Sequence, residues 1–70
     1  MKQLVFKTKN GVELFLDEET HTYSSDNFPA VFDALEEDFY GPDPLASNMA
    51  WMLTVDMYMS TTGLKIPGAS

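Results

Sequence analysis

Residues 3–17 read QLVFKTKNGVELFLD, in which two short apolar runs lie on either side of Asn10-Gly11. This dipeptide between apolar runs is the strongest short-range signal for a β-hairpin, because Asn and Gly accept the positive φ angles of tight turns. The aromatic and branched residues of both runs are typical of strands. The stretch therefore predicts an antiparallel β-hairpin.

Two registers of this hairpin are compatible with the turn. A two-residue loop pairs Lys9 with Val12 and mixes apolar and charged side chains on both faces. A three-residue loop pairs Thr8 with Val12, with Gly11 in the left-handed conformation. The second register gathers Leu4, Phe6, Thr8, Val12, Leu14 and Leu16 on one face. A slip by one residue would move every side chain to the other face, so the register that separates apolar from charged side chains is favoured. We therefore expect the three-residue loop. Its cross-strand pairs would be Lys7 with Glu13, Lys2 with Glu18 and Val5 with Phe15.

A third strand is predicted directly after the hairpin. Residues 17–20 are polar and typical of a tight turn, and His21, Thr22 and Tyr23 have the composition of a strand. The N-terminal part, residues 3–24, is therefore a hairpin or a three-stranded meander.

A first helix is predicted over residues 27–40. Asp26 and Asn27 are good N-cap residues, Pro29 is tolerated in the first turn, and Gly41 ends the helix. One apolar stripe consists of Phe28, Val31, Phe32, Leu35 and Phe39. The opposite side carries Asp33, Glu37 and Tyr40, with Glu36 and Asp38 on the flanks.

A second helix is predicted over residues 44–60, with Asp43 as its N-cap and Pro44 at its first position. A broad stripe is formed by Leu45, Met49, Met52, Val55 and Met59, and Trp51 widens it. A helix that is apolar nearly all round needs burial on more than one side. We therefore expect a leftover arc, including Trp51, Ala50 or Met57, to meet a partner or a second copy. The candidate oligomer interface is Met49, Trp51, Met52, Val55 and Met59.

These elements predict an α+β fold in a single small domain, residues 1–70, in which an N-terminal antiparallel hairpin or meander packs with two α-helices. The apolar face of the hairpin would cover the first helix, and the second helix would complete the core. Residues 65–70 are expected to fray. A domain of this size buries only about 60% of its unfolded surface, so its stability is marginal.

The charge balance excludes several classes of function. The chain has 4 basic and 11 acidic residues, a net charge of −7 and no Cys. A disulfide scaffold, a Cys-ligated metal centre and a thiol nucleophile are excluded, and direct binding to nucleic acid is disfavoured. No stretch approaches the ~20 apolar residues of a membrane helix, and the N-terminus does not resemble a signal peptide. We therefore expect a cytoplasmic protein that does not act at a membrane.

No motif for catalysis is found. The sequence has no nucleophile elbow and no phosphate-binding loop, and His21 is its one histidine. We therefore predict no enzyme, no catalytic residue, no cofactor and no metal site. A third hypothesis is a weak site for a hard divalent cation, formed by Asp17, Glu18, Glu19 and His21. We favour the simpler interpretation that these residues form a solvated turn.

The acidic residues form the most distinctive pattern. Every residue from Asn10 to Leu64 that is charged at neutral pH is Asp or Glu. On the first helix, Asp33, Glu36 and Glu37 would lie about 5–6 Å apart at Cβ, close to the spacing of phosphates along a nucleic acid. Such carboxylates can enter a groove built for phosphates. The predicted partner-binding residues are Asp17, Glu18, Glu19, Asp26, Asp33, Glu36, Glu37, Asp38 and Asp43.

In size, acidity and these acidic runs the chain resembles small phage-encoded inhibitors of host nucleic-acid machinery, including anti-CRISPR proteins and other DNA mimics. The resemblance implies a non-enzymatic inhibitor that blocks the Lys/Arg-rich groove of a larger protein, in the host-cell cytoplasm. The alternative is a structural or oligomerisation subunit, for example a homodimer, that binds through its Met- and Trp-rich second helix.

Overall fold

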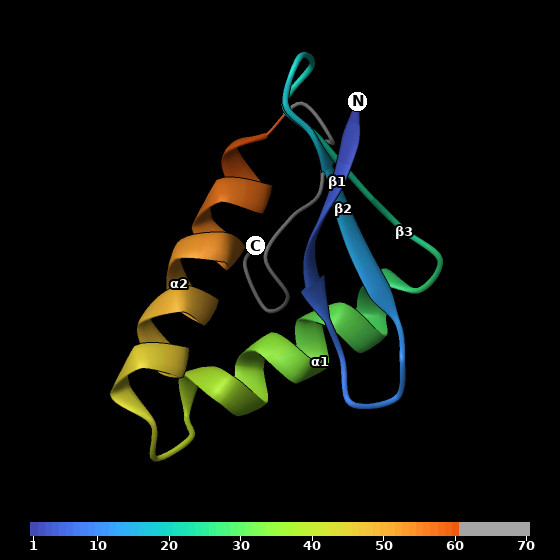
Figure 1. Cartoon of the computed structure of the whole chain (residues 1–70). Coiled ribbons are helices and arrows are strands. Elements are labelled where there is room, and N and C mark those ends of the chain that lie inside the picture. Colours follow the sequence, from blue (N-terminus) through green and yellow to red (C-terminus); the bar gives the residue numbers. More distant parts are fainter. Residues whose placement is uncertain (61–70) are drawn as a thin grey trace.

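The computed structural model describes residues 1–60, and the predicted fraying of residues 65–70 lies outside them. Three antiparallel strands are followed by two helices, which confirms the predicted α+β fold (Figure 1). The elements are β1 (Lys2–Lys7), β2 (Glu13–Asp17), β3 (Thr22–Ser25), α1 (Phe28–Phe39) and α2 (Pro44–Met59).

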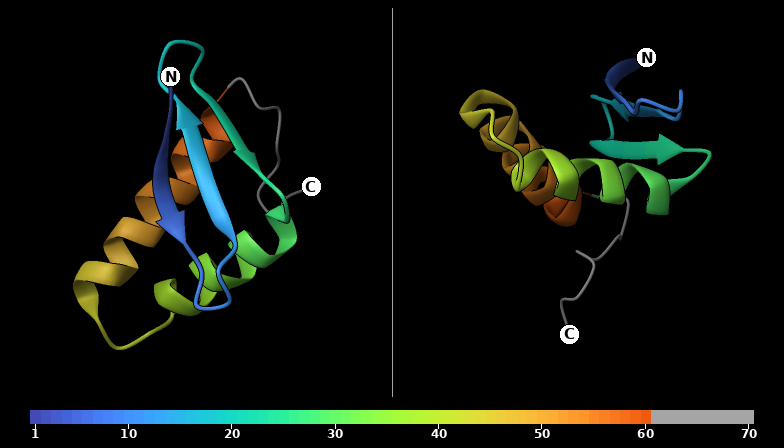
Figure 2. Two further views of the ribbon diagram at one scale, coloured as in Figure 1. Left: turned by 45° about the vertical axis from the view of Figure 1, so that its right-hand side comes forward. Right: turned by 90° about the horizontal axis from the view of Figure 1, so that it is seen from below.

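The sheet and the helices form two layers. The strand order is β1-β2-β3, and both helices lie on the same side of the sheet (Figure 2). α1 runs across the sheet near the β1–β2 loop, and α2 returns toward the β2–β3 turn (Figure 1). The buried core between the layers consists of Leu14, Tyr23, Val31, Leu35, Ala50 and Met57.

The turn between β1 and β2 confirms the three-residue loop. Thr8 N donates to the Val12 carbonyl at 2.8 Å, and Gly11 N donates to the Thr8 carbonyl at 3.0 Å. Gly11 has a φ of 89°, the left-handed conformation that glycine adopts without steric cost. The predicted loop length and the predicted left-handed conformation of Gly11 are therefore both confirmed.

Farther from the turn, part of the predicted register is wrong. Lys7 lies opposite Glu13 as expected, but the register shifts between Leu4 and Phe6. A β-bulge at this point adds one residue to β1 without a counterpart in β2. The pairs beyond it are Leu4 with Phe15, Gln3 with Leu16 and Lys2 with Asp17. The predicted pairs of Val5 with Phe15 and of Lys2 with Glu18 are therefore wrong.

The bulge also changes which side chains reach the core. Val5 is half-buried and packs against the core, whereas Leu4 is 48% exposed. Strict alternation placed Leu4 on the buried face together with Leu14, so this part of the prediction is wrong. An extra residue in one strand moves the side chains beyond it to the opposite face of the sheet, and for this reason Leu4 points outward.

α1 begins and ends close to the predicted residues. The Asn27 side chain accepts a hydrogen bond from Ala30 N at 3.2 Å, as an N-cap does. Val31 and Leu35 are buried, and Phe28 and Phe32 pack against the core, so the predicted apolar stripe is confirmed over most of its length. The exception is Phe39, which lies at the exposed end of the helix.

α2 starts as predicted but faces a different way. The Asp43 side chain accepts from Leu45 N at 3.0 Å, and Pro44 is the first helical residue. Ala50 and Met57 are buried and Leu53 is partly buried, so the expectation that Ala50 or Met57 belongs to an outer arc is wrong. In the predicted stripe, Val55 is half-buried and the other four residues are exposed: Leu45, Met49, Met52 and Met59. A helix that is apolar all round has no preferred side by itself, so its neighbours decide its rotation.

Candidate protein-binding surface

Three acidic side chains share the outward side of α1. Asp33, Glu36 and Glu37 are exposed and, with Tyr40 and Gly41, line a shallow depression. The side chains of Asp33 and Glu36 make no hydrogen bond or ion pair with any other residue from 1 to 60. These three residues are called the acidic face below. Glu36 and Glu37 each lie about one helical turn from Asp33, and the three carboxylates are open to a cationic ligand.

Glu37 is the member of the acidic face that forms an ion pair within residues 1–60. Its Oε1 lies 3.4 Å from Lys9 Nζ in the β1–β2 loop. The two side chains are 71% and 90% exposed, so the pair is well solvated and adds little stability. A partner's cation can therefore replace Lys9 at small cost.

The other predicted acidic residues do not join this face. Asp17, Glu18 and Glu19 belong to the β2–β3 turn region, at the opposite end of the molecule from α1 (Figure 1). Asp17 accepts from Glu19 N at 3.1 Å within the turn, and Glu18 accepts from Gln3, which connects the turn to β1. Asp43 caps α2. The structure therefore separates the predicted residues and leaves one compact group on α1.

Two further predicted residues lie before α1 and within it, outside the acidic face. Asp26 is exposed in the segment that joins β3 to α1. Asp38 is half-buried and lines the cleft between α2 and the sheet instead of the outward side of α1. Neither carboxylate lines the depression of the acidic face.

An aromatic pocket adjoins the acidic face between α1 and α2. The ring centroids of Phe39 and Trp51 are 5.8 Å apart, and those of Phe39 and Tyr40 are 4.9 Å apart with an edge-on geometry. The pocket has a volume of about 290 Å³ and shares Glu36 and Tyr40 with the depression of the acidic face. Its lining residues are Phe32, Leu35, Glu36, Phe39, Tyr40, Trp51 and Thr54.

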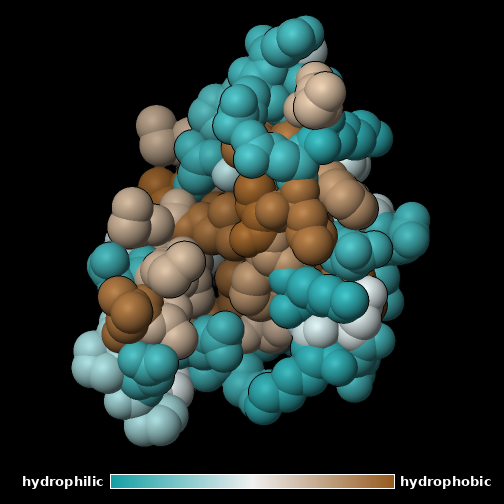
Figure 3. Space-filling model, in the orientation of Figure 1, coloured by the Kyte–Doolittle hydropathy of each residue, from teal (hydrophilic) through white to brown (hydrophobic). Residues whose placement is uncertain are grey.

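A second, more apolar cleft of about 380 Å³ lies between β1 and α2. Figure 3 shows apolar residues in the middle of this side of the molecule, between the sheet and α2, with hydrophilic residues around them. The cleft is lined by Val5, Phe6, Leu35, Asp38, Ala46, Met49, Ala50, Met52 and Leu53. Flexible methionines at its rim suit contact with surfaces of more than one shape. Of the predicted oligomer interface, Met49 and Met52 line this cleft, and Trp51 lines the aromatic pocket.

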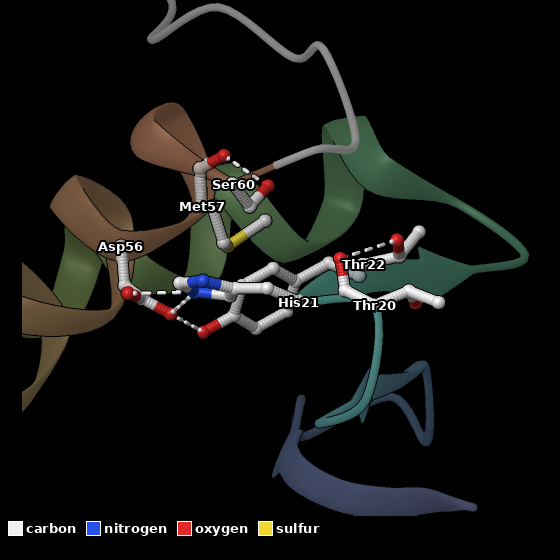
Figure 4. Close-up of polar contacts among 7 residues, drawn as sticks. Thr20, His21, Thr22, Asp56, Met57 and Ser60 are labelled. Atoms are coloured by element: carbon white, nitrogen blue, oxygen red, sulfur yellow. Dashed lines mark hydrogen bonds and ion pairs between the residues drawn. The ribbon is translucent and has the colours of Figure 1, made fainter.

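A polar cluster joins the end of α2 to the β2–β3 turn, and sequence reasoning missed it. His21 Nε2 lies 2.9 Å from both carboxylate oxygens of Asp56, and the Tyr23 hydroxyl donates to the same carboxylate (Figure 4). His21 and Asp56 are 35 residues apart, so no local pattern could relate them. His21 thus turns toward α2, and residues 1–60 contain no group of acidic and histidine side chains that could hold a metal ion.

The cluster shifts the pKa of two of its members. Burial and the hydrogen bond to Asp56 raise the pKa of Tyr23 well above its ordinary value. The hydrogen bond from Tyr23, with a smaller contribution from His21, lowers the pKa of Asp56, although burial acts against this change. Asp56 is therefore ionised in the folded state at neutral pH and binds its neighbours as a carboxylate.

This shift predicts a pH-dependent stability difference between the wild-type chain and Asp56→Asn. Because the folded state lowers the pKa of Asp56, its stabilisation is present above the unfolded pKa, near 4, and is lost as pH falls through the lower folded pKa. Because the Asp56 side chain is 42% exposed and solvent screens its interactions, we expect the variant at pH 7 to be less stable by no more than about 1 kcal/mol. The difference should vanish toward pH 2, as measured by urea denaturation.

Glu19→Gln is the matched control for this experiment. The Glu19 side chain is exposed and makes no hydrogen bond or ion pair among residues 1–60. We expect little change in its stability relative to the wild type at either pH. A stability difference for Asp56→Asn that is independent of pH would contradict the role given to the carboxylate charge.

Comparison with known proteins finds no matching family model, no similar curated protein and no similar solved structure. Neither helix within residues 1–60 is long and apolar enough to cross a membrane.

Proposed function

We propose that this chain is a non-enzymatic protein-binding module whose acidic face occupies a Lys/Arg-rich nucleic-acid site on a larger protein. The observation that carries the proposal is the grouping of Asp33, Glu36 and Glu37 on one side of α1, where the side chains of Asp33 and Glu36 make no ion pair within residues 1–60. Carboxylates at this spacing present the partner with charges similar to those of successive phosphates. The chain thereby acts as an inhibitor of the kind found among phage-encoded DNA mimics, including anti-CRISPR proteins.

The strong net charge supports this proposal in a second way. A protein with a net charge of −7 attracts a cationic cleft over distances of several ångströms, and salt screens this attraction. The acidic face then sets the orientation of the bound chain, because its carboxylates are fixed on a helix. Association should therefore be fast at low ionic strength and weaken as salt is added.

The test uses a charge reversal on the acidic face. Partners are captured from a nuclease-treated lysate of the host cells, and each is then assayed for binding to labelled nucleic acid with and without the chain. The wild-type chain should displace the nucleic acid. Glu36→Lys combined with Glu37→Lys should weaken this displacement by about tenfold or more.

Glu18→Lys combined with Glu19→Lys is the matched control, because it changes the net charge by the same amount at the other end of the molecule. We expect this control to compete within about threefold of the wild type at physiological salt, where distant charges are screened. The proposal fails if the two double variants lose the same affinity, or if the wild-type chain leaves nucleic-acid binding by every captured protein unchanged.

The second candidate function is self-association through the outer side of α2. Residues 44–55 contain no residue charged at neutral pH, although the chain is strongly acidic. Leu45, Met49, Met52 and Trp51 are exposed on this part of the helix. Two copies could therefore bury these side chains while their acidic residues remain apart, whereas contact through α1 would bring like charges together.

Sedimentation velocity over a range of concentrations tests this candidate. A dimer should appear as the concentration rises, and Met49→Gln combined with Met52→Gln should shift the chain toward the monomer by weakening apolar burial. Glutamine is similar to methionine in size and adds no charge, so net repulsion stays the same. A wild-type chain that remains monomeric throughout would exclude this candidate.

A further inference from the structure

We propose that the aromatic pocket binds the guanidinium group of an arginine side chain from the partner. This inference rests on the proposed function, because it names the group that a cationic partner inserts beside the acidic face. The aromatic pocket combines the exposed rings of Phe39, Tyr40 and Trp51 with the carboxylate of Glu36. An aromatic surface next to an unpaired carboxylate matches both the flat faces and the charge of a guanidinium group.

The position of the pocket supports this occupant. It shares Glu36 and Tyr40 with the depression of the acidic face, so a partner that neutralises Asp33 and Glu37 has a neighbouring side chain within reach of the pocket. Glu36 belongs to both sites and makes no ion pair within residues 1–60. No lysine is among the residues that line either site. Within residues 1–60, Lys9 forms an ion pair with Glu37 and not with Glu36, so the cation expected at Glu36 comes from another molecule.

The ring geometry favours arginine over lysine. Phe39 and Trp51 are tilted by 31° with centroids 5.8 Å apart, so they lie too close for a third group to enter between them. The rings therefore form an open wall and do not enclose a compact ammonium group on several sides. A planar guanidinium can lie against such a wall and still direct N–H groups toward a carboxylate at its edge. A purely apolar side chain would leave Glu36 without a partner.

Trp51 supplies a direct measurement, because it is the one tryptophan in the chain. Capped peptides Lys-Gly-X-Gly-Lys, in which X is arginine, citrulline or lysine, are titrated into the ¹⁵N-labelled protein at low salt. The arginine and lysine peptides have the same charge, and the arginine and citrulline peptides have nearly the same shape. We expect a saturable shift of the Trp51 indole N–H signal with arginine, a smaller one with lysine and a negligible one with citrulline.

Glu36→Gln should lower the affinity for the arginine peptide by about threefold or more, because it removes the charge-assisted hydrogen bond and preserves the shape of the side chain. Glu19→Gln, with the same change of charge far from the pocket, should leave that affinity close to the wild-type value. Equal indole shifts with arginine and citrulline would overturn the inference, and so would an unchanged affinity in Glu36→Gln.

The proposed function can survive when this inference fails. If the arginine and lysine peptides shift the backbone signals of Asp33 and Glu37 in a salt-sensitive way but leave the Trp51 indole unmoved, the acidic face binds cations and the aromatic pocket does not. That result overturns the pocket alone. The nucleic-acid competition with the two charge-reversed double variants separately decides the proposed function.

Discussion

Leu14→Ala should lower the free energy of unfolding by about 3 kcal/mol or more. Leu14 lies in the central strand, is 0% exposed and belongs to the core between the sheet and the helices. Truncation removes buried apolar surface and leaves a cavity that the two layers cannot fully close. A domain of this length has a total stability of roughly 4–10 kcal/mol, so urea denaturation should show a large loss, or a largely unfolded chain.

Leu4→Ala is the matched control for Leu14→Ala. Strict strand alternation places both leucines on the same face, whereas the β-bulge leaves Leu4 48% exposed. We therefore expect the control to cost about 1 kcal/mol or less. Similar losses for the two variants would show that the bulge does not turn Leu4 outward in solution.

Met57→Ala should destabilise the chain by about 2–4 kcal/mol. Met57 is 0% exposed and fills the core from α2, near the polar cluster of His21, Tyr23 and Asp56. Its loss weakens the packing of α2 on the rest of the core. Circular dichroism during urea denaturation measures the change through the midpoint of the transition.

Met59→Ala, two positions later in α2, is the control for Met57→Ala. Met59 is 75% exposed, so Met59→Ala should change the stability by no more than about 0.5 kcal/mol. If instead Met59→Ala were the more damaging variant, α2 would have the rotation that the sequence pattern predicted, and the exposed surface assigned to α2 would be wrong.

The two helices contribute different properties to the candidate surface. α1 supplies fixed charge, because Asp33, Glu36 and Glu37 project from the side opposite its buried residues Val31 and Leu35. α2 supplies Trp51, which completes the aromatic pocket beside Glu36. Neither helix forms this pocket alone, so its integrity depends on the packing of α2. Binding by the pocket should therefore be lost together with the tertiary structure.

Local sequence information was sufficient for several features. Asn10-Gly11 predicted the turn, Asp26 or Asn27 was expected to cap α1 and Asp43 to cap α2, and the spacing of apolar residues in α1 predicted its buried side. Each of these features depends on residues close together in the chain. The outward position of the carboxylates on α1 follows from the same spacing, so the acidic face could also be predicted.

Other features were decided by contacts between distant segments. No pattern in the sequence marked the β-bulge that turns Leu4 outward, and the uniform apolarity of α2 left its rotation open until it packed with Ala50 and Met57 inward. The aromatic pocket and the polar cluster of His21, Tyr23 and Asp56 likewise join residues from separate elements. The sequence by itself determined the elements, their caps and the charge of α1, because these depend on local backbone energetics. Tertiary packing decided which sides meet, because burial is a property of the whole assembled core.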